Sequence, residues 1–187
     1  MFRAMLWSQW RESRLAMVVL AGIALAVPLL SLSGAGAASD PWASWDLLGA
    51  TAQWGAAYPV LALAAALALA AGAWWPDHRT KHVYALTLPV SRARYLLLRY
   101  VTGLTLLSAI AALLALSAFV ATVRVPLPTL LHAYPGGITL RFFFAGLSAY
   151  TILFALSGLT PRMARIIAAG FLLLVLASIV ADLASLG

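Results

Sequence analysis

Residues 61–75 read LALAAALALAAGAWW, and their pattern narrows the possible folds more than any other part of the chain. Polar and apolar residues do not alternate in this stretch, as they would in a strand of a membrane β-barrel. It belongs to an apolar run, residues 56–75, that is long enough to cross the hydrocarbon core as a helix. A helix satisfies its backbone hydrogen bonds within one segment, which lipid requires. The stretch therefore predicts a transmembrane helix.

The rest of the chain has the composition of a polytopic membrane protein. Of its 187 residues, 64% are hydrophobic and only 9% are charged, whereas soluble domains carry about 25% charged residues. Five runs are apolar and long enough to span a membrane: residues 15–32, 56–75, 96–120, 142–159 and 166–186. We predict an all-α fold in which residues 1–187 form a single transmembrane domain of five transmembrane helices. Cysteine is absent, which excludes disulfides and thiolate-bound metals.

Residues 1–14 predict an amphipathic helix that lies at the membrane surface. Its apolar residues recur at four-residue spacing, and its cations lie mostly on the other flank. The two sets are Phe2, Leu6 and Trp10, and Arg3, Arg11 and Arg14. A plain extension of the first span is the alternative. Residues 1–39 also have features of a secretory signal peptide, but the charged front is long and carries three aromatic residues, so we expect an uncleaved span.

The cations gather at one side of the predicted spans. Ten of the twelve lie before the first span, around the connector 76–95 or between the last two spans. By the positive-inside rule this side is the cytoplasm, so five spans place the N-terminus inside and the C-terminus outside. The headgroup anchors we expect are Arg3, Trp7, Trp10, Arg11, Arg14, Arg94 and Arg99. Because the net charge of +7 comes from cations that flank the spans, we expect a lipid bilayer and no nucleic acid as partner.

The connector 76–95 reads PDHRTKHVYALTLPVSRARY. Pro89 lacks an N–H and breaks a helix, and Ser91 can cap the helix that follows. Three apolar residues of the connector would be poorly placed in water alone: Val83, Leu86 and Leu88. They indicate a protein partner beneath the membrane. An ordinary basic connector whose leucines lie on lipid is the alternative.

Signatures of catalysis and metal binding are absent or weak. The chain has no phosphate-binding loop of the form G-x-x-x-x-G-K-[ST], no G-x-S-x-G and no H-E-x-x-H. We therefore expect no enzyme activity of the chain by itself, no catalytic residue, no metal and no cofactor. His78 and His82 are four residues apart and would share a helix face. They lie at the water boundary, where we expect a solvated role and not a metal or haem.

The connector resembles the first cytoplasmic loop of the type-2 ABC exporter permeases. In that family an acidic residue, a short coupling helix and a pattern close to L-x-x-L-P-V-S-R precede a long third span. This chain has Asp77, then Leu86-Thr87-Leu88-Pro89-Val90-Ser91-Arg92. MLWSQWRESR, residues 5–14, resembles the family's opening amphipathic segment, with Gln9 where an acid is common. SGLTPRMAR, residues 157–165, resembles its loop between the fourth and fifth spans.

The resemblance implies a permease subunit of an ATP-driven exporter in a prokaryotic cytoplasmic (inner) membrane. Its partners would be a separate ABC ATPase, which binds the coupling helix, and a second permease subunit, identical or not. The residues implied in ATPase coupling are Asp77, Val83, Leu86, Leu88, Pro89, Val90, Ser91 and Arg92. No substrate-binding residue is indicated.

Two features depart from the family pattern. The family usually has six spans, and five are predicted here. The family also often has a glycine soon after the acidic residue, where this chain has Arg79, Thr80 and Lys81. The missing span keeps a second hypothesis open, in which the chain is a non-transporting structural or accessory subunit of a larger membrane complex. A membrane enzyme or redox carrier is disfavoured by the lack of paired acids, cysteines and intramembrane histidines.

Overall fold

The computed structural model of the protein describes residues 2–33, 49, 54–55, 57–79, 91–124 and 134–158. Within these ranges it is all-helical and is built on four long α-helices. They are α1 (Phe2–Ser33), α3 (Ala57–Arg79), α5 (Arg92–Arg124) and α6 (Pro135–Ser157). Each of the four is long and apolar enough to cross a membrane. The predicted all-α fold is therefore confirmed for the described residues, and four helices of this length and apolarity indicate a multi-pass membrane protein.

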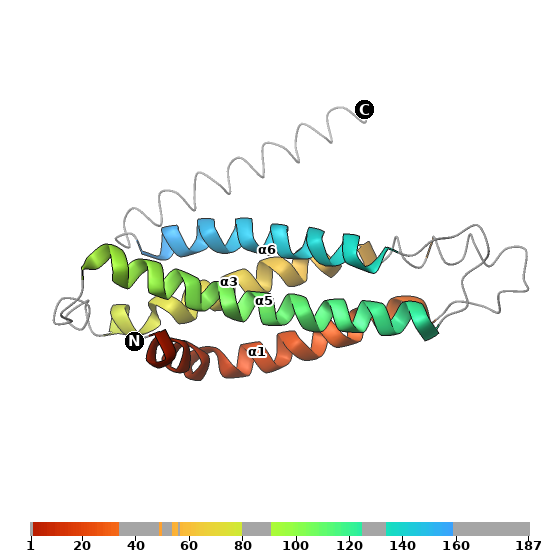
Figure 1. Ribbon diagram of the computed structural model, residues 1–187, viewed down its shortest axis with the longest axis horizontal. Coiled ribbons are helices and arrows are strands. Elements are labelled where there is room, and N and C mark those ends of the chain that lie inside the picture. The colour runs from red at the N-terminus through yellow and green to blue at the C-terminus, as the bar shows by residue number, and fades with distance from the viewer. Residues whose placement is uncertain are drawn as a thin grey trace, which may run out of the picture.

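The helices lie side by side along one axis (Figure 1). α1 packs mainly against α5, and α3 packs mainly against α6. α1 and α5 run in the same direction. Near their starts Thr102 donates a hydrogen bond to Gln9, and further along both helices Ser117 donates to the Leu25 carbonyl. α3 and α6 are also parallel to each other, because Trp74 near the end of one contacts Phe154 near the end of the other. The starts of α1 and α5 thus share one end of the bundle with the ends of α3 and α6.

Four of the predicted spans correspond to these helices, but three helices begin before the predicted span that each contains. α1 begins at Phe2 and not at residue 15. α5 begins at Arg92 and not at residue 96, and α6 begins at Pro135 and not at residue 142. A run of apolar residues identifies only the part of a helix that suits lipid. The backbone hydrogen bonds of the helix continue into the more polar residues at its ends. Proline suits the start of α6 because its missing N–H needs no partner there. The fifth predicted span, residues 166–186, lies outside the described residues and stays a prediction.

Small side chains let α3 pack closely in the bundle. Five of its alanines have at most 1% of their surface exposed: Ala62, Ala65, Ala66, Ala70 and Ala73. Gly72 faces Ser13 of α1, where an added Cβ would lie 3.3 Å from the Ser13 Cβ. Such residues allow helix backbones to approach in lipid, where packing and not water exclusion drives association.

The first turns of α1 differ from the expected surface helix. α1 is one helix from Phe2 onward, so residues 1–14 are not a separate element. Its first turns nevertheless leave the line of the rest of the helix (Figure 1). Two polar side chains in these turns are buried against the bundle: Gln9 is 5% exposed and Ser13 is 4% exposed. The prediction of a distinct amphipathic surface helix is therefore not confirmed.

Candidate functional site

Cations of the described residues gather at the end of the bundle where α1 and α5 begin. This end, here called the basic end, carries Arg3, Arg11, Arg14, Arg92, Arg94 and Arg99. Arg124 and Arg141 lie toward the opposite end. Between Arg99 and Arg124, residues 100–123 of α5 carry no charge and extend about 36 Å. That length exceeds the hydrocarbon core of about 30 Å, so α5 is long enough to hold Arg99 and Arg124 at opposite surfaces of a bilayer.

The most buried charge of the described residues is Asp77, in the last turn of α3. Its carboxylate has no exposed surface and forms an ion pair with Arg99 of α5. The Tyr95 hydroxyl, one turn before Arg99, lies 3.0 and 3.1 Å from the two carboxylate oxygens and donates to them. An ionised group loses its hydration when it is buried, and it persists only when it is paired and hydrogen-bonded. Asp77 therefore requires both α5 side chains.

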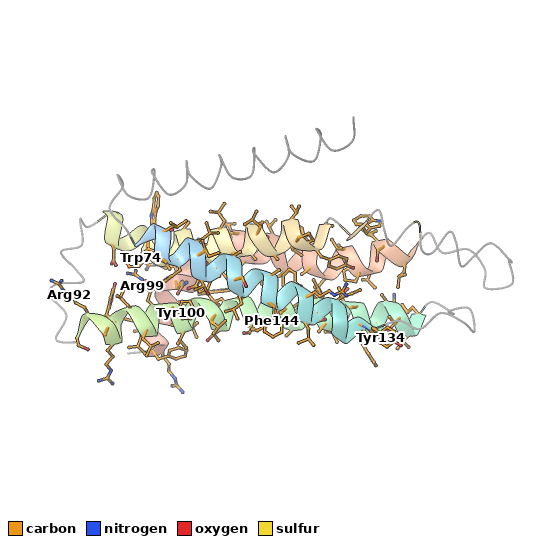
Figure 2. The ribbon with its side chains drawn as sticks, turned by 90° about the horizontal axis from the view of Figure 1, so that it is seen from above. Trp74, Arg92, Arg99, Tyr100, Tyr134 and Phe144 are labelled. Atoms are coloured by element: carbon orange, nitrogen blue, oxygen red, sulfur yellow. The ribbon has the colours of Figure 1, made fainter. Side chains whose placement is uncertain are left out.

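Aromatic rings enclose the guanidinium of Arg99. Its Cζ lies 5.6 Å from the centroid of the Trp74 ring and 5.1 Å from that of the Tyr95 ring. Figure 2 shows Arg99 and Trp74 close together beside α6, whereas Arg92 points away from the bundle. A cation within about 6 Å of an aromatic face is attracted by the ring quadrupole. The rings thus stabilise Arg99 where water is largely excluded.

Trp74 extends the site to α6. Its indole N–H donates to the Phe154 carbonyl at 2.9 Å, and the two rings lie 5.3 Å apart. Tyr100 of α5 stacks on Tyr150 of α6 at 5.4 Å and bonds to Thr151 at 2.8 Å. These contacts join the ends of α3 and α6 to the start of α5.

A neighbouring set of polar groups brings in α1. The Gln9 amide donates to the Leu69 carbonyl of α3 at 3.3 Å and accepts a hydrogen bond from the Thr102 hydroxyl of α5. Beside Thr102, Gly103 leaves room for the Tyr150 hydroxyl of α6, which an added Cβ would overlap. All four described helices therefore meet through polar side chains at one end of the bundle.

We call this assembly the interhelical cluster. Its members are Gln9, Trp74, Asp77, Tyr95, Arg99, Tyr100, Thr102, Tyr150 and Phe154. Its groups are paired with one another, and the described residues contain no group of three side chains that could hold a metal. Its hydrogen bonds, ion pair and ring contacts join the four described helices at one end of the bundle.

The cluster changes the interpretation of Asp77 and Arg99. Asp77 was expected at a surface that an ATPase contacts, but it is buried and can act only through its neighbours. Arg99 was expected as a headgroup anchor, but its side chain is only 11% exposed and faces Asp77. The reason is that Arg99 lies one turn after Tyr95 on the face of α5 that packs on α3. The four-residue spacing of Tyr95 and Arg99 was visible in the sequence, but their partner was not.

Some of the other predicted site residues are described by the structure, and the rest lie outside the described residues. The expected anchors Arg3, Trp7, Trp10, Arg11, Arg14 and Arg94 are all exposed at the basic end. Ser91 directly precedes α5, and its carbonyl accepts a hydrogen bond from the Tyr95 N–H at 3.0 Å. Arg92 is exposed in the first turn of α5. Val83, Leu86, Leu88, Pro89 and Val90 lie outside the described residues.

No family model, curated protein or solved structure matches the chain.

Proposed function

We propose that the chain is a membrane-spanning permease subunit of an ATP-driven exporter. A separate ABC ATPase would bind the connector between α3 and α5, and a second permease subunit would complete the pathway. The location would be a prokaryotic cytoplasmic membrane, with the basic end in the cytoplasm. Five spans would then place the C-terminus outside.

The buried pair of Asp77 and Arg99 supports this proposal most strongly. Asp77 lies in the last turn of α3, where the connector begins, and Arg99 lies two turns into α5, just after the connector ends. Because the pair joins these turns, a force on the connector would move α3 and α5 together. Trp74 and Gln9 would pass that movement to α6 and α1 through their hydrogen bonds. A binding partner could thus shift a packed helix bundle without entering the membrane.

The arginines Arg92 and Arg94 are suited to contact the ATPase. Both are exposed in the first turn of α5, at the end of the connector. The first turns of α1 would lie in the headgroup layer beside them, as a lever on the rest of that helix. Among the side chains whose burial the structure describes, the buried charges are Asp77 and its partner Arg99, which neutralise each other. This favours an apolar or amphipathic substrate.

The test is a pull-down of the tagged chain in mild detergent, with mass spectrometry of the proteins that accompany it. We expect a stoichiometric ATPase with a phosphate-binding loop. Arg92→Glu/Arg94→Glu should reduce its recovery at least about tenfold, since two interface cations become anions. Arg124→Glu/Arg141→Glu is the matched control, because both arginines are exposed toward the opposite end.

Two results would contradict parts of the proposal. If no ATPase accompanies the unaltered chain and other membrane proteins do, the chain is a non-transporting accessory subunit. If the ATPase is recovered equally with Arg92→Glu/Arg94→Glu, the connector is not its binding site.

A further inference from the structure

An open groove lies between the first turns of α1 and the side of α5, at the basic end. Its volume is about 340 Å³, and it is lined by Arg3, Leu6, Trp7, Trp10 and Leu106. The volume lies within the range of small-molecule sites, about 300–1,000 Å³. The lining surface is almost entirely apolar, so Arg3 contributes the aliphatic stem of its side chain to the wall, and a guanidinium on such a stem can reach the headgroup layer. We propose that the groove binds one anionic phospholipid of the adjacent leaflet. This proposal does not rest on the permease assignment.

The position of the groove suits an acyl chain below a headgroup. Leu106 lies seven residues beyond Arg99 along α5, about 10 Å deeper into the bilayer. Trp7 is 67% exposed and Trp10 is 37% exposed, so both rings present surface to an incoming chain. Indole rings are enriched at this level because one edge is apolar and the other is polar. The groove thus runs from the headgroup layer into the hydrocarbon region.

Charge selects an anionic headgroup. Arg3 is the one ionisable residue among those that line the groove. Arg11 lies further along the same helix, does not line the groove and has Glu12 at 3.8 Å. Arg3 can therefore bind a phosphate at the groove mouth without competition from a lining carboxylate. Arg11 supplies only the general attraction of a basic surface.

Native mass spectrometry of the full chain in detergent tests the proposal, with dioleoylphosphatidylglycerol and dioleoylphosphatidylcholine as probes. We expect the first phosphatidylglycerol to bind about fivefold more tightly than phosphatidylcholine, as one cation near an anionic surface gives. Arg3→Gln should abolish this preference, and Arg11→Gln should preserve it. Trp10→Ala should weaken both lipids, because it removes a wall and not the charge.

The proposal is overturned if the unaltered chain shows no preference between the two lipids. It is also overturned if Arg3→Gln and Arg11→Gln reduce the preference equally, since this indicates diffuse attraction. Quenching of tryptophan fluorescence by brominated phosphatidylglycerol is the second measurement. It should fall in Trp7→Phe/Trp10→Phe but not in Trp75→Phe, a variant at an exposed ring on α3. Equal loss in both variants would place the lipid elsewhere.

Discussion

Asp77 has no exposed surface, so its contribution to stability depends on Arg99 and Tyr95. Asp77→Ala leaves the guanidinium of Arg99 without its counter-ion. Removing one partner of a buried pair costs about 3–5 kcal/mol, so we expect a marked fall in the unfolding temperature in detergent. The double variant Asp77→Ala/Arg99→Ala should be less destabilised than the two single effects added together. Arg94→Gln, at an exposed cation, is the control and should change little.

A similar loss in Arg94→Gln would show that overall charge matters and not the pair. Additive effects in the double variant would show that Asp77 and Arg99 do not interact energetically.

Alanine substitutions at two glycines distinguish the effect of close helix packing on stability from the effect of helix propensity. An added Cβ at Gly103 would overlap the Tyr150 hydroxyl, whereas one at Gly22 would meet nothing within 4 Å. Gly103→Ala should therefore lower the free energy of unfolding by about 1–3 kcal/mol, as overpacking does. Gly22→Ala should leave it unchanged or raise it by up to about 1 kcal/mol, because alanine favours the helix. Equal thermal shifts of the two variants in detergent would contradict the close approach of α5 and α6.

At the scale of elements, the first turns of α1 are held by a side chain that a surface helix would not need. Gln9 bonds to Leu69 and Thr102, on two different helices. Gln9→Ala should free these turns, at a cost of about 1–2 kcal/mol. Trypsin added to membranes whose basic end is accessible should then cut several-fold faster at Arg11 and Arg14. Ser8→Ala, at an exposed position of the same helix, should be cut at the original rate.

An unchanged cutting rate in Gln9→Ala would mean that lipid, and not the bundle, holds the start of α1.

The apolar runs predicted the four described helices because lipid allows few other structures for such segments. The same reasoning missed helix boundaries. α6 extends seven residues before its predicted span, through Pro135, Gly136 and Gly137. Glycine and proline commonly mark turns, but proline at the start of a helix and glycines in its first turn are compatible with the helix seen here.

At the scale of the whole molecule, the orientation in the membrane can be tested with single cysteines, because the chain has none. Arg94 and Tyr134 are both exposed and lie toward opposite ends of the bundle. A membrane-impermeant maleimide added to intact cells should label Tyr134→Cys and not Arg94→Cys. Inside-out vesicles should show the reverse, as the distribution of cations predicts. Labelling of Arg94→Cys in intact cells would invert the topology.

Sequence alone was enough to predict that the described segments are helices, that each is apolar enough to cross a membrane, and that most of their cations lie at one end. These properties follow from composition and from the length of apolar runs, which each segment carries independently of the others. Only the tertiary structure decided that Asp77 and Arg99 form a buried pair and that Gln9 ties α1 to its neighbours. The groove lined by Arg3 and Leu106 likewise exists only because α1 packs against α5. The reason is that partners 22 to 103 residues apart in the chain meet only through the packing of helices, which no local pattern encodes.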